Sequence, residues 1–183
     1  MQPPIKVGHV HFRTRRLELR PLHIADAPRL ALLAGDYDVA SMTGSIPHPY
    51  NEQMAAEWIA SAQKGEEGVV FAISHTGVLI GCTGYRAKAK DHAEMGYWLG
   101  KPFWGQGFAT EAVEAVIRHA FEADGFDYLI AGHFSDNPAS KRIIEKLGFE
   151  PLGTETRECA ARGGEASCIT YRLDRAAASR LTA

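Results

Sequence analysis

The segment Trp104-Gly105-Gln106-Gly107-Phe108-Ala109-Thr110 decides the fold, because it joins two strongly patterned stretches. Before it lies an almost wholly apolar run, residues 93–99, which is typical of a strand in the middle of a sheet. After it, apolar residues recur over residues 109–121 at the spacing of one helix face. The sequence therefore predicts a buried strand, a glycine-rich turn and a long amphipathic helix.

The glycine-rich turn predicts an anion site. Glycines allow a tight turn that leaves backbone N–H groups uncovered, and the helix N-terminus adds about half a positive charge, which suits phosphate. A nucleoside-triphosphate loop is excluded because no Lys-Ser/Thr pair follows the glycines. The dinucleotide pattern is missing because Thr110 stands where its third glycine would be. From glycine spacing alone, a plain strand-to-helix turn is the alternative.

The patterns on either side of this segment predict the other elements. Strands are expected at residues 16–20, 69–74, 78–85, 93–99, 127–134, 149–157 and 167–173. Helices are expected after Asp26, after the cap Asn51, over residues 109–121 and after the cap Asn137. This order predicts one α/β (α+β) domain over residues 1–183, with a single mixed, mostly antiparallel sheet of about seven strands flanked by about four helices. The ends, residues 1–12 and 176–183, are expected to be flexible.

Composition and charge fit one ordinary domain. The chain has 183 residues, 45% hydrophobic and 23% charged, which excludes long disorder, collagen and coiled coil. Its net charge of −2 argues against a DNA-binding protein. It lacks an apolar run of about 18 residues, a signal-peptide start and a clustered histidine pattern, so we expect a cytoplasmic protein with no membrane partner and no metal. Three cysteines without a CxxC pair do not indicate a disulfide framework.

Several motifs in order resemble the GNAT acetyltransferase superfamily, and within it the Rim-type branch, which acetylates N-terminal amines. The resemblance spans residues 14–173 and is carried by residues 14–21, 94–99, 104–112, 137–140 and 145–149. In the superfamily's loop pattern, Arg/Gln-x-x-Gly-x-Gly/Ala, Trp104 takes the first place, Gly107 the fourth and Ala109 the sixth. The aromatic first residue departs from this pattern in a way that the Rim-type branch tolerates.

The resemblance implies acetyl-CoA as the acetyl donor. Backbone N–H groups of the loop would hold its pyrophosphate, and the strand 93–99 would offer backbone groups to the pantetheine arm, which would lie beside it like an extra strand. Residues at the start of the last helix would meet the same arm. The expected cofactor-binding residues are Tyr97, Trp98, Leu99, Gly105, Gln106, Gly107, Phe108, Ala109, Thr110, Asn137 and Ser140.

The resemblance also implies that a primary amine attacks the thioester directly, with no acyl-enzyme. Glu94 is the predicted base, directly or through a water, because burial of the lone carboxylate in its strand would raise its pKa; the alternative is a glutamate held in a salt bridge. Ser140 is predicted to assist the leaving thiolate or only to contact the cofactor, since Ile144 stands where many relatives carry a tyrosine acid. His133 is a further candidate for proton transfer, whereas Cys82 is expected to pack rather than react.

The acceptor is expected to be the N-terminal amine of a protein or peptide, whose pKa of about 7.7–8.0 lets it lose its proton near pH 7. Its predicted site includes Met42, His48, Tyr50 and Trp58. An enzyme that acetylates a polyamine, an amino acid or an aminoglycoside stays open, as do a catalytically weak CoA-binding module and a homodimer. A peptide acceptor would need an open groove with acidic residues, and a small amine would need a closed aromatic pocket.

Overall fold

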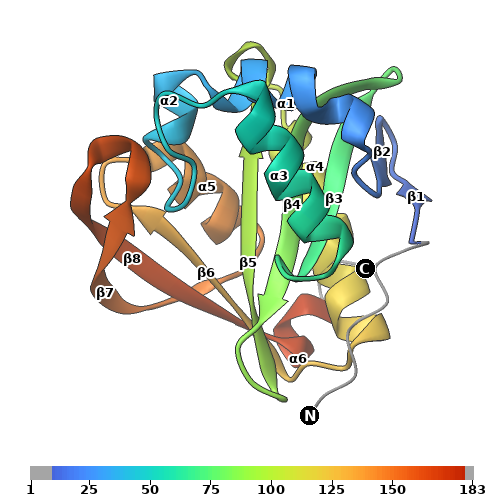
Figure 1. Ribbon diagram of the computed structural model, residues 1–183. Helices are drawn as coiled ribbons and strands as arrows, with labels where there is room; N and C mark the ends of the chain where they lie inside the picture. Colours follow the sequence, from blue (N-terminus) through green and yellow to red (C-terminus); the bar gives the residue numbers. More distant parts are fainter. Residues whose placement is uncertain (1–9, 180–183) are drawn as a thin grey trace.

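Strands from both halves of the chain join one sheet in the order β1-β2-β3-β4-β5-β6-β8-β7, in a computed structural model that describes residues 10–179 (Figure 1). The strands are β1 Phe12–Arg13, β2 Leu17–Arg20, β3 Val69–His75, β4 Val78–Ala87, β5 His92–Leu99, β6 Tyr128–Phe134, β7 Glu150–Cys159 and β8 Gly164–Asp174. Among these described strands, only β5 and β6 pair in parallel. The mixed, mostly antiparallel sheet confirms the predicted class. Its described strands number eight rather than about seven, because the two-residue β1 extends one edge.

Four helices of eight residues or more form where the patterns predict them. The described α-helices are α1 Ala27–Ala34, α2 Tyr37–Ala40, α3 Glu52–Gln63, α4 Phe108–Ala123, α5 Pro138–Lys146 and α6 Arg175–Ala178. The predicted caps Asn51 and Asn137 accept hydrogen bonds from the backbone N–H groups of Met54 and Ser140, at 3.0 and 3.1 Å. The one-turn helices α2 and α6 were not predicted, because four residues are too few to show a helical period.

The helices cover both faces of the sheet and bury two separate clusters of apolar side chains (Figure 1). One cluster joins the sheet to α4 and α5, and the other joins it to α1 and α3. Strand β5 contributes to both, because successive side chains point to opposite faces. Met95 and Leu99 lie in the α4 cluster, whereas Trp98 packs against the α1 and α3 cluster.

Strands β5 and β6 separate after a short stretch of pairing. Their paired residues are His92 with Tyr128, Ala93 with Leu129 and Glu94 with Ile130. Beyond Glu94, β5 continues to Leu99 with pairing to β4 alone, and the two ribbons diverge (Figure 1). The last residues of β5 therefore have an edge in the middle of the sheet that no described strand fills.

The chain ends differ from the prediction of flexible tails. Phe12 belongs to β1, and residues 175–178 form α6, whose Ala178 is buried against β8 and α4. Residues 1–9 and 180–183 of the predicted tails lie outside the described part of the chain. Within residues 10–179 no helix is long and apolar enough to cross a bilayer. The same residues contain no group of three metal-ligating side chains placed to hold an ion.

Candidate functional site

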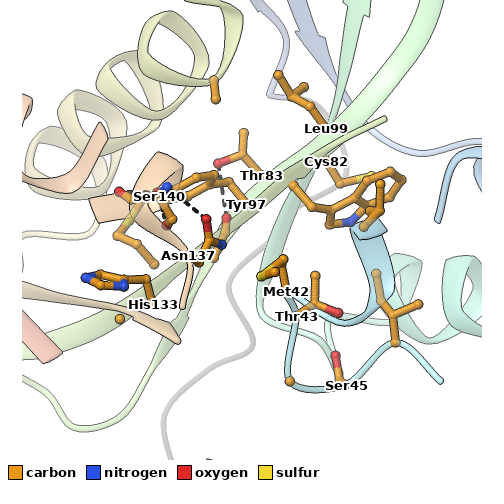
Figure 2. Close-up of a pocket in the computed structure, with 18 of the residues that line it drawn as sticks. Met42, Thr43, Ser45, Cys82, Thr83, Tyr97, Leu99, His133, Asn137 and Ser140 are labelled. Atoms are coloured by element: carbon orange, nitrogen blue, oxygen red, sulfur yellow. Dashed lines mark hydrogen bonds between the residues drawn. The ribbon is translucent and has the colours of Figure 1, made fainter. Parts of the chain in front are cut away.

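A cavity of about 1540 Å³ lies where β5 and β6 separate. Its lining draws on both faces of the sheet, including Phe108 and Ile143 on the α4 side and Leu30 and Trp58 on the α1 side. Figure 2 shows that side chains from β5, α5 and the segment before α3 face this space. The separation of two strands therefore lets groups on opposite faces of the sheet reach the same point.

The glycine-rich turn lines one end of the cavity in the expected conformation. Gly105 and Gly107 have φ angles of +72° and +78°, in the left-handed region that favours glycine. Gly107 is the N-cap of α4 and carries no capping side chain, so the first N–H groups of that helix are left for a ligand. Gly105, Gly107, Phe108, Ala109 and Thr110 all line the cavity. Gln106 does not, and its side chain instead donates to the carbonyl of Pro102 at 3.1 Å.

An arginine that the sequence analysis did not single out supports this turn. Arg16 donates through Nη1 to the carbonyl oxygen of Gln106 at 2.9 Å and through Nε to Glu111 at 2.7 Å. Thr14 donates to the same carboxylate at 2.6 Å. Burial opposes ionisation of Glu111, but the hydrogen bonds from Thr14 and Arg16 hold its pKa below the ordinary value. The segment before β2 is thereby tied to the first turn of α4, with a cation beside the anion site.

Trp104 explains the departure from the superfamily's loop pattern. Its indole Nε1 donates to the carbonyl oxygen of Leu99 at 2.8 Å. That hydrogen bond joins the end of β5 to the start of the turn, five residues later. An aromatic side chain at the first loop position therefore positions the turn, while the backbone N–H groups stay available for the anion.

The residues expected along the pantetheine arm meet at the gap between β5 and α5. Tyr97, Trp98, Leu99, Asn137 and Ser140 all line the cavity. The hydroxyl oxygens of Tyr97 and Ser140 are 2.7 Å apart (Figure 2). The sequence analysis assigned only a backbone role to Tyr97, because strand periodicity does not show which residue of a distant helix a side chain will meet.

Glu94 lines the cavity, but its expected rise in pKa is wrong. The carboxylate, 19% exposed, pairs with Lys88 at 2.9 Å and with Arg157 of β7. Burial favours the neutral acid, yet the hydrogen bonds and charges of these two cations hold the pKa of Glu94 below its ordinary value. The environment is that of the salt-bridge alternative, and the role of Glu94 as a base stays a prediction.

His133 and Cys82 are both buried, and both ring nitrogens of His133 form hydrogen bonds. His133 places Nδ1 2.7 Å from the carbonyl oxygen of Phe134, so this nitrogen carries the proton and donates it. Its Nε2 is hydrogen-bonded to the hydroxyl of Tyr171 at 3.0 Å. No ring nitrogen is left for proton transfer to a substrate. Cys82 is 3% exposed and burial raises the pKa of its thiol, which suits the expected packing role.

Three of the four predicted acceptor residues line the cavity. Met42, Tyr50 and Trp58 do so, from the segment between α2 and α3 and from α3 itself. His48 does not: it is exposed, and its ring lies edge-on to Tyr37 with centroids 5.2 Å apart. The structure therefore does not bring His48 to the cavity, because its ring packs against Tyr37 instead.

Carboxylates are frequent on the side of the lining where Met42, Tyr50 and Trp58 lie, which we call the acceptor side after their predicted role. Asp38 pairs with Lys101, and Glu67 pairs with Arg86 at 2.5 Å. Glu57 of α3 and Glu158 of β7 also line the cavity, and neither forms an ion pair with a cation of residues 10–179. Glu57 accepts a hydrogen bond from Gln53 at 3.0 Å, but no cation of the described residues neutralises either carboxylate.

Comparison with known proteins identifies the family. Residues 16–150 match a model described as an acetyltransferase (GNAT) domain. The uncharacterized N-acetyltransferase YoaA of Bacillus subtilis is 32% identical over 148 residues, which cover 78% of this chain and 84% of that protein.

Solved structures of the same fold contain coenzyme A. Mycobacterium smegmatis RimJ in complex with CoA-disulfide aligns with a TM-score of 0.77 and 18% identity over 91% of this chain and 88% of that one. RimL, a ribosomal L7/L12 alpha-N-protein acetyltransferase in complex with coenzyme A, aligns with a TM-score of 0.75 and 18% identity over 88% and 95%. These two likenesses show the fold, and the family match covers most of the chain. The protein therefore belongs to the GNAT acetyltransferase family and is an N-acetyltransferase.

Proposed function

We propose that this enzyme transfers the acetyl group of acetyl-CoA to the N-terminal amine of a protein or peptide. The observation that carries the proposal is the cavity between β5 and β6, which joins an anion-binding turn to an acidic acceptor side. One substrate can approach from the α4 face and the other from the α1 face. Their reacting groups then meet where the sheet is open.

The donor side fits acetyl-CoA by its chemistry. The uncapped N-terminus of α4 suits a pyrophosphate, and Arg142 and Lys146 of α5 add positive charge to the same lining. The edge of β5 that no described strand fills suits the amide groups of pantetheine. The coenzyme A bound by RimJ and RimL, which share this fold, is consistent with the assignment.

The acceptor side fits a peptide N-terminus better than a lysine side chain. The rim of the cavity is exposed at Gly44, Ser45 and Glu158, so an extended acceptor can leave the site toward solvent. Glu57 and Glu158 suit an ammonium group before it loses its proton. Because the pKa of Glu94 is low, it is a weak base, and an N-terminal amine of pKa about 7.7–8.0 needs less help than a lysine of about 10.4.

The proposed reaction balances without a further reactant. The neutral amine attacks the thioester carbon, a C–N bond forms, and the C–S bond breaks with its electron pair going to sulfur. One amine proton passes to water held by Glu94, and the sulfur takes a proton from solvent while a hydroxyl donor stabilises it. Ser140, on the cofactor side of the gap, is that donor in this proposal.

The acceptor class is tested by following thiol release from acetyl-CoA. The panel contains lysine-free peptides with a free N-terminus, lysine-containing peptides with a blocked N-terminus, spermidine, free amino acids and an aminoglycoside. We expect turnover with the free N-termini and mass addition at the first residue. Turnover with a small amine alone would replace the peptide acceptor by the small-molecule one. Binding of acetyl-CoA by calorimetry without any turnover would indicate a CoA-binding module.

A further inference from the structure

We propose that Tyr97 is a positioning residue whose hydroxyl orients the Ser140 hydroxyl to donate a hydrogen bond to the leaving sulfur. The inference rests on the proposed acetyl transfer and adds a role for a side chain that the family motifs assign only through its backbone. The contact that carries it lies between β5 and α5, at the gap where β5 and β6 separate.

The two hydroxyls approach each other across this gap from different elements. Tyr97 extends from β5, Ser140 stands in the first turn of α5, and their oxygens are 2.7 Å apart (Figure 2). Asn137 holds the backbone of Ser140 by accepting its N–H at 3.1 Å. Both hydroxyl-bearing residues line the cavity. The serine is therefore fixed at its main chain by the helix cap and at its side chain by the tyrosine.

The direction of this hydrogen bond decides whether the pair presents a hydrogen-bond donor to the cavity. If the Ser140 hydroxyl donates to Tyr97, the Tyr97 hydroxyl donates in turn to the carbonyl oxygen of Ser140, which is 3.4 Å away. Neither proton then points into the cavity. If Tyr97 donates to Ser140, the serine proton is free to point into the cavity. A negative sulfur favours the second arrangement, because it attracts that proton.

The pair acts as a hydrogen-bond donor and keeps both of its protons. Burial raises the pKa of Tyr97 to about 12, although its hydrogen bond with Ser140 opposes part of the rise. A thiolate with the pKa of an ordinary thiol, about 8.5, is too weak a base to remove a proton from either hydroxyl. The negative sulfur is therefore stabilised by the serine O–H until solvent protonates it, which leaves the overall proton balance unchanged.

The position of Ile144 explains why the tyrosine hydroxyl beside Ser140 comes from β5 and not from α5. Ile144 is 1% exposed and lies in the α4 cluster, where it does not line the cavity. The place that holds a tyrosine in many superfamily members is thus occupied by a core side chain. Tyr97 brings a phenol to the same helix from the opposite side of the gap.

A double-mutant cycle tests the assignment with Tyr97→Phe, Ser140→Ala and the double variant, each measured for kcat, KM and CoA affinity by calorimetry. Tyr85→Phe is the control: its hydroxyl donates to Asp124 at 2.5 Å, at the other end of α4. We expect Ser140→Ala to lower kcat about 10²-fold, as for loss of a donor in the transition state. Tyr97→Phe should lower kcat about tenfold, the scale of one hydrogen bond. The double variant should be no slower than Ser140→Ala, because Tyr97 acts through the serine.

Two outcomes would overturn the role of Tyr97. In one, kcat losses multiply in the double variant, which makes the two hydroxyls independent. In the other, Tyr97→Phe weakens CoA binding while kcat at saturation stays unchanged, which makes the tyrosine a binding residue. The cycle is run on whichever amine is acetylated fastest. A small-molecule acceptor would therefore contradict the peptide proposal and still leave the cycle as a test of Tyr97.

Discussion

Glu94 lines the cavity and is paired with two cations. Its sequence environment, one carboxylate in an apolar strand, predicts a raised pKa, but Lys88 and Arg157 reverse the sign. Arg157 is 63 residues away in the chain, so no local pattern announces the contact. Since the pKa of Glu94 is lowered, this carboxylate is ionised throughout the range in which an amine loses its proton. The titration of Glu94 itself then adds no pH dependence above about pH 6.

The Glu94→Gln variant tests whether this carboxylate helps to remove the amine proton. We expect kcat/KM near pH 7 to fall about 10²-fold and to recover in part by about pH 10, where the amine is already neutral. Glu155→Gln is the control, because Glu155 also pairs with Arg157 but does not line the cavity. pH–rate profiles from about pH 6 to 10 provide the measurement. Parallel profiles for Glu94→Gln and wild type would make Glu94 a structural residue.

The turn before α4 shows how much of one element the sequence predicts. The apolar period locates the helix and its buried face, and the glycines locate the turn, since both signals are local. The sequence does not show that Arg16 and Thr14 contact Glu111, because they lie about 95 positions earlier in the chain. Nor does the sequence show that the side chain of Gln106 turns toward Pro102, and the backbone contact of Gln106 with the phosphates stays a prediction. Backbone conformation is thus predictable here, and side-chain direction depends on the neighbouring element.

The Gly107→Glu variant tests the anion site. A glutamate here has an unfavourable left-handed φ and brings a negative charge to the place proposed for pyrophosphate. We expect acetyl-CoA affinity measured by calorimetry to fall more than about tenfold while the circular dichroism spectrum stays that of wild type. Gly77→Glu is the matched control, with the same φ of +78° and open space in the β3–β4 hairpin. Equal affinities in the two variants would contradict the assignment of phosphate to this turn.

At the scale of the whole molecule, the sequence predicts the layers better than the connections between them. Seven strands and four helices follow from periods and caps, whereas β1, α2 and α6 are too short to show a period. Asp26 is the N-cap residue of α1, where the sequence predicts that a helix begins, but its carboxylate accepts from Arg20 at 2.8 Å and from the N–H of His23 at 2.8 Å and does not cap α1. A cap and an ion pair use the same residue type, so sequence alone does not separate them. The direction of the His48 side chain is likewise not predictable, because the loop that carries it has no hydrophobic period.

The Arg20–Asp26 pair connects the sheet to the helical layer that covers the acceptor side, so we expect it to stabilise the whole molecule. Both side chains are largely buried, at 20% and 12% exposure, and two nitrogens of Arg20 meet both carboxylate oxygens. Burial opposes ionisation of Asp26, but the hydrogen bonds from Arg20 and His23 hold its pKa below the ordinary value. We expect Asp26→Asn to lower the free energy of unfolding by about 2 kcal/mol at pH 7, because the Arg20 charge loses its partner.

The pH dependence of this difference has a definite sign. A carboxyl with a lowered folded-state pKa contributes its full stability above the unfolded pKa of about 3.9, and loses it as the pH falls through the folded value. Urea midpoints at about pH 7, 5 and 3 should therefore show wild type approaching Asp26→Asn only below about pH 4. Glu114→Gln, which removes an exposed pair with Arg118, should change the midpoint little at any of these pH values. A gap between wild type and Asp26→Asn that stayed constant to pH 3 would show that Asp26 acts through packing and not through its charge.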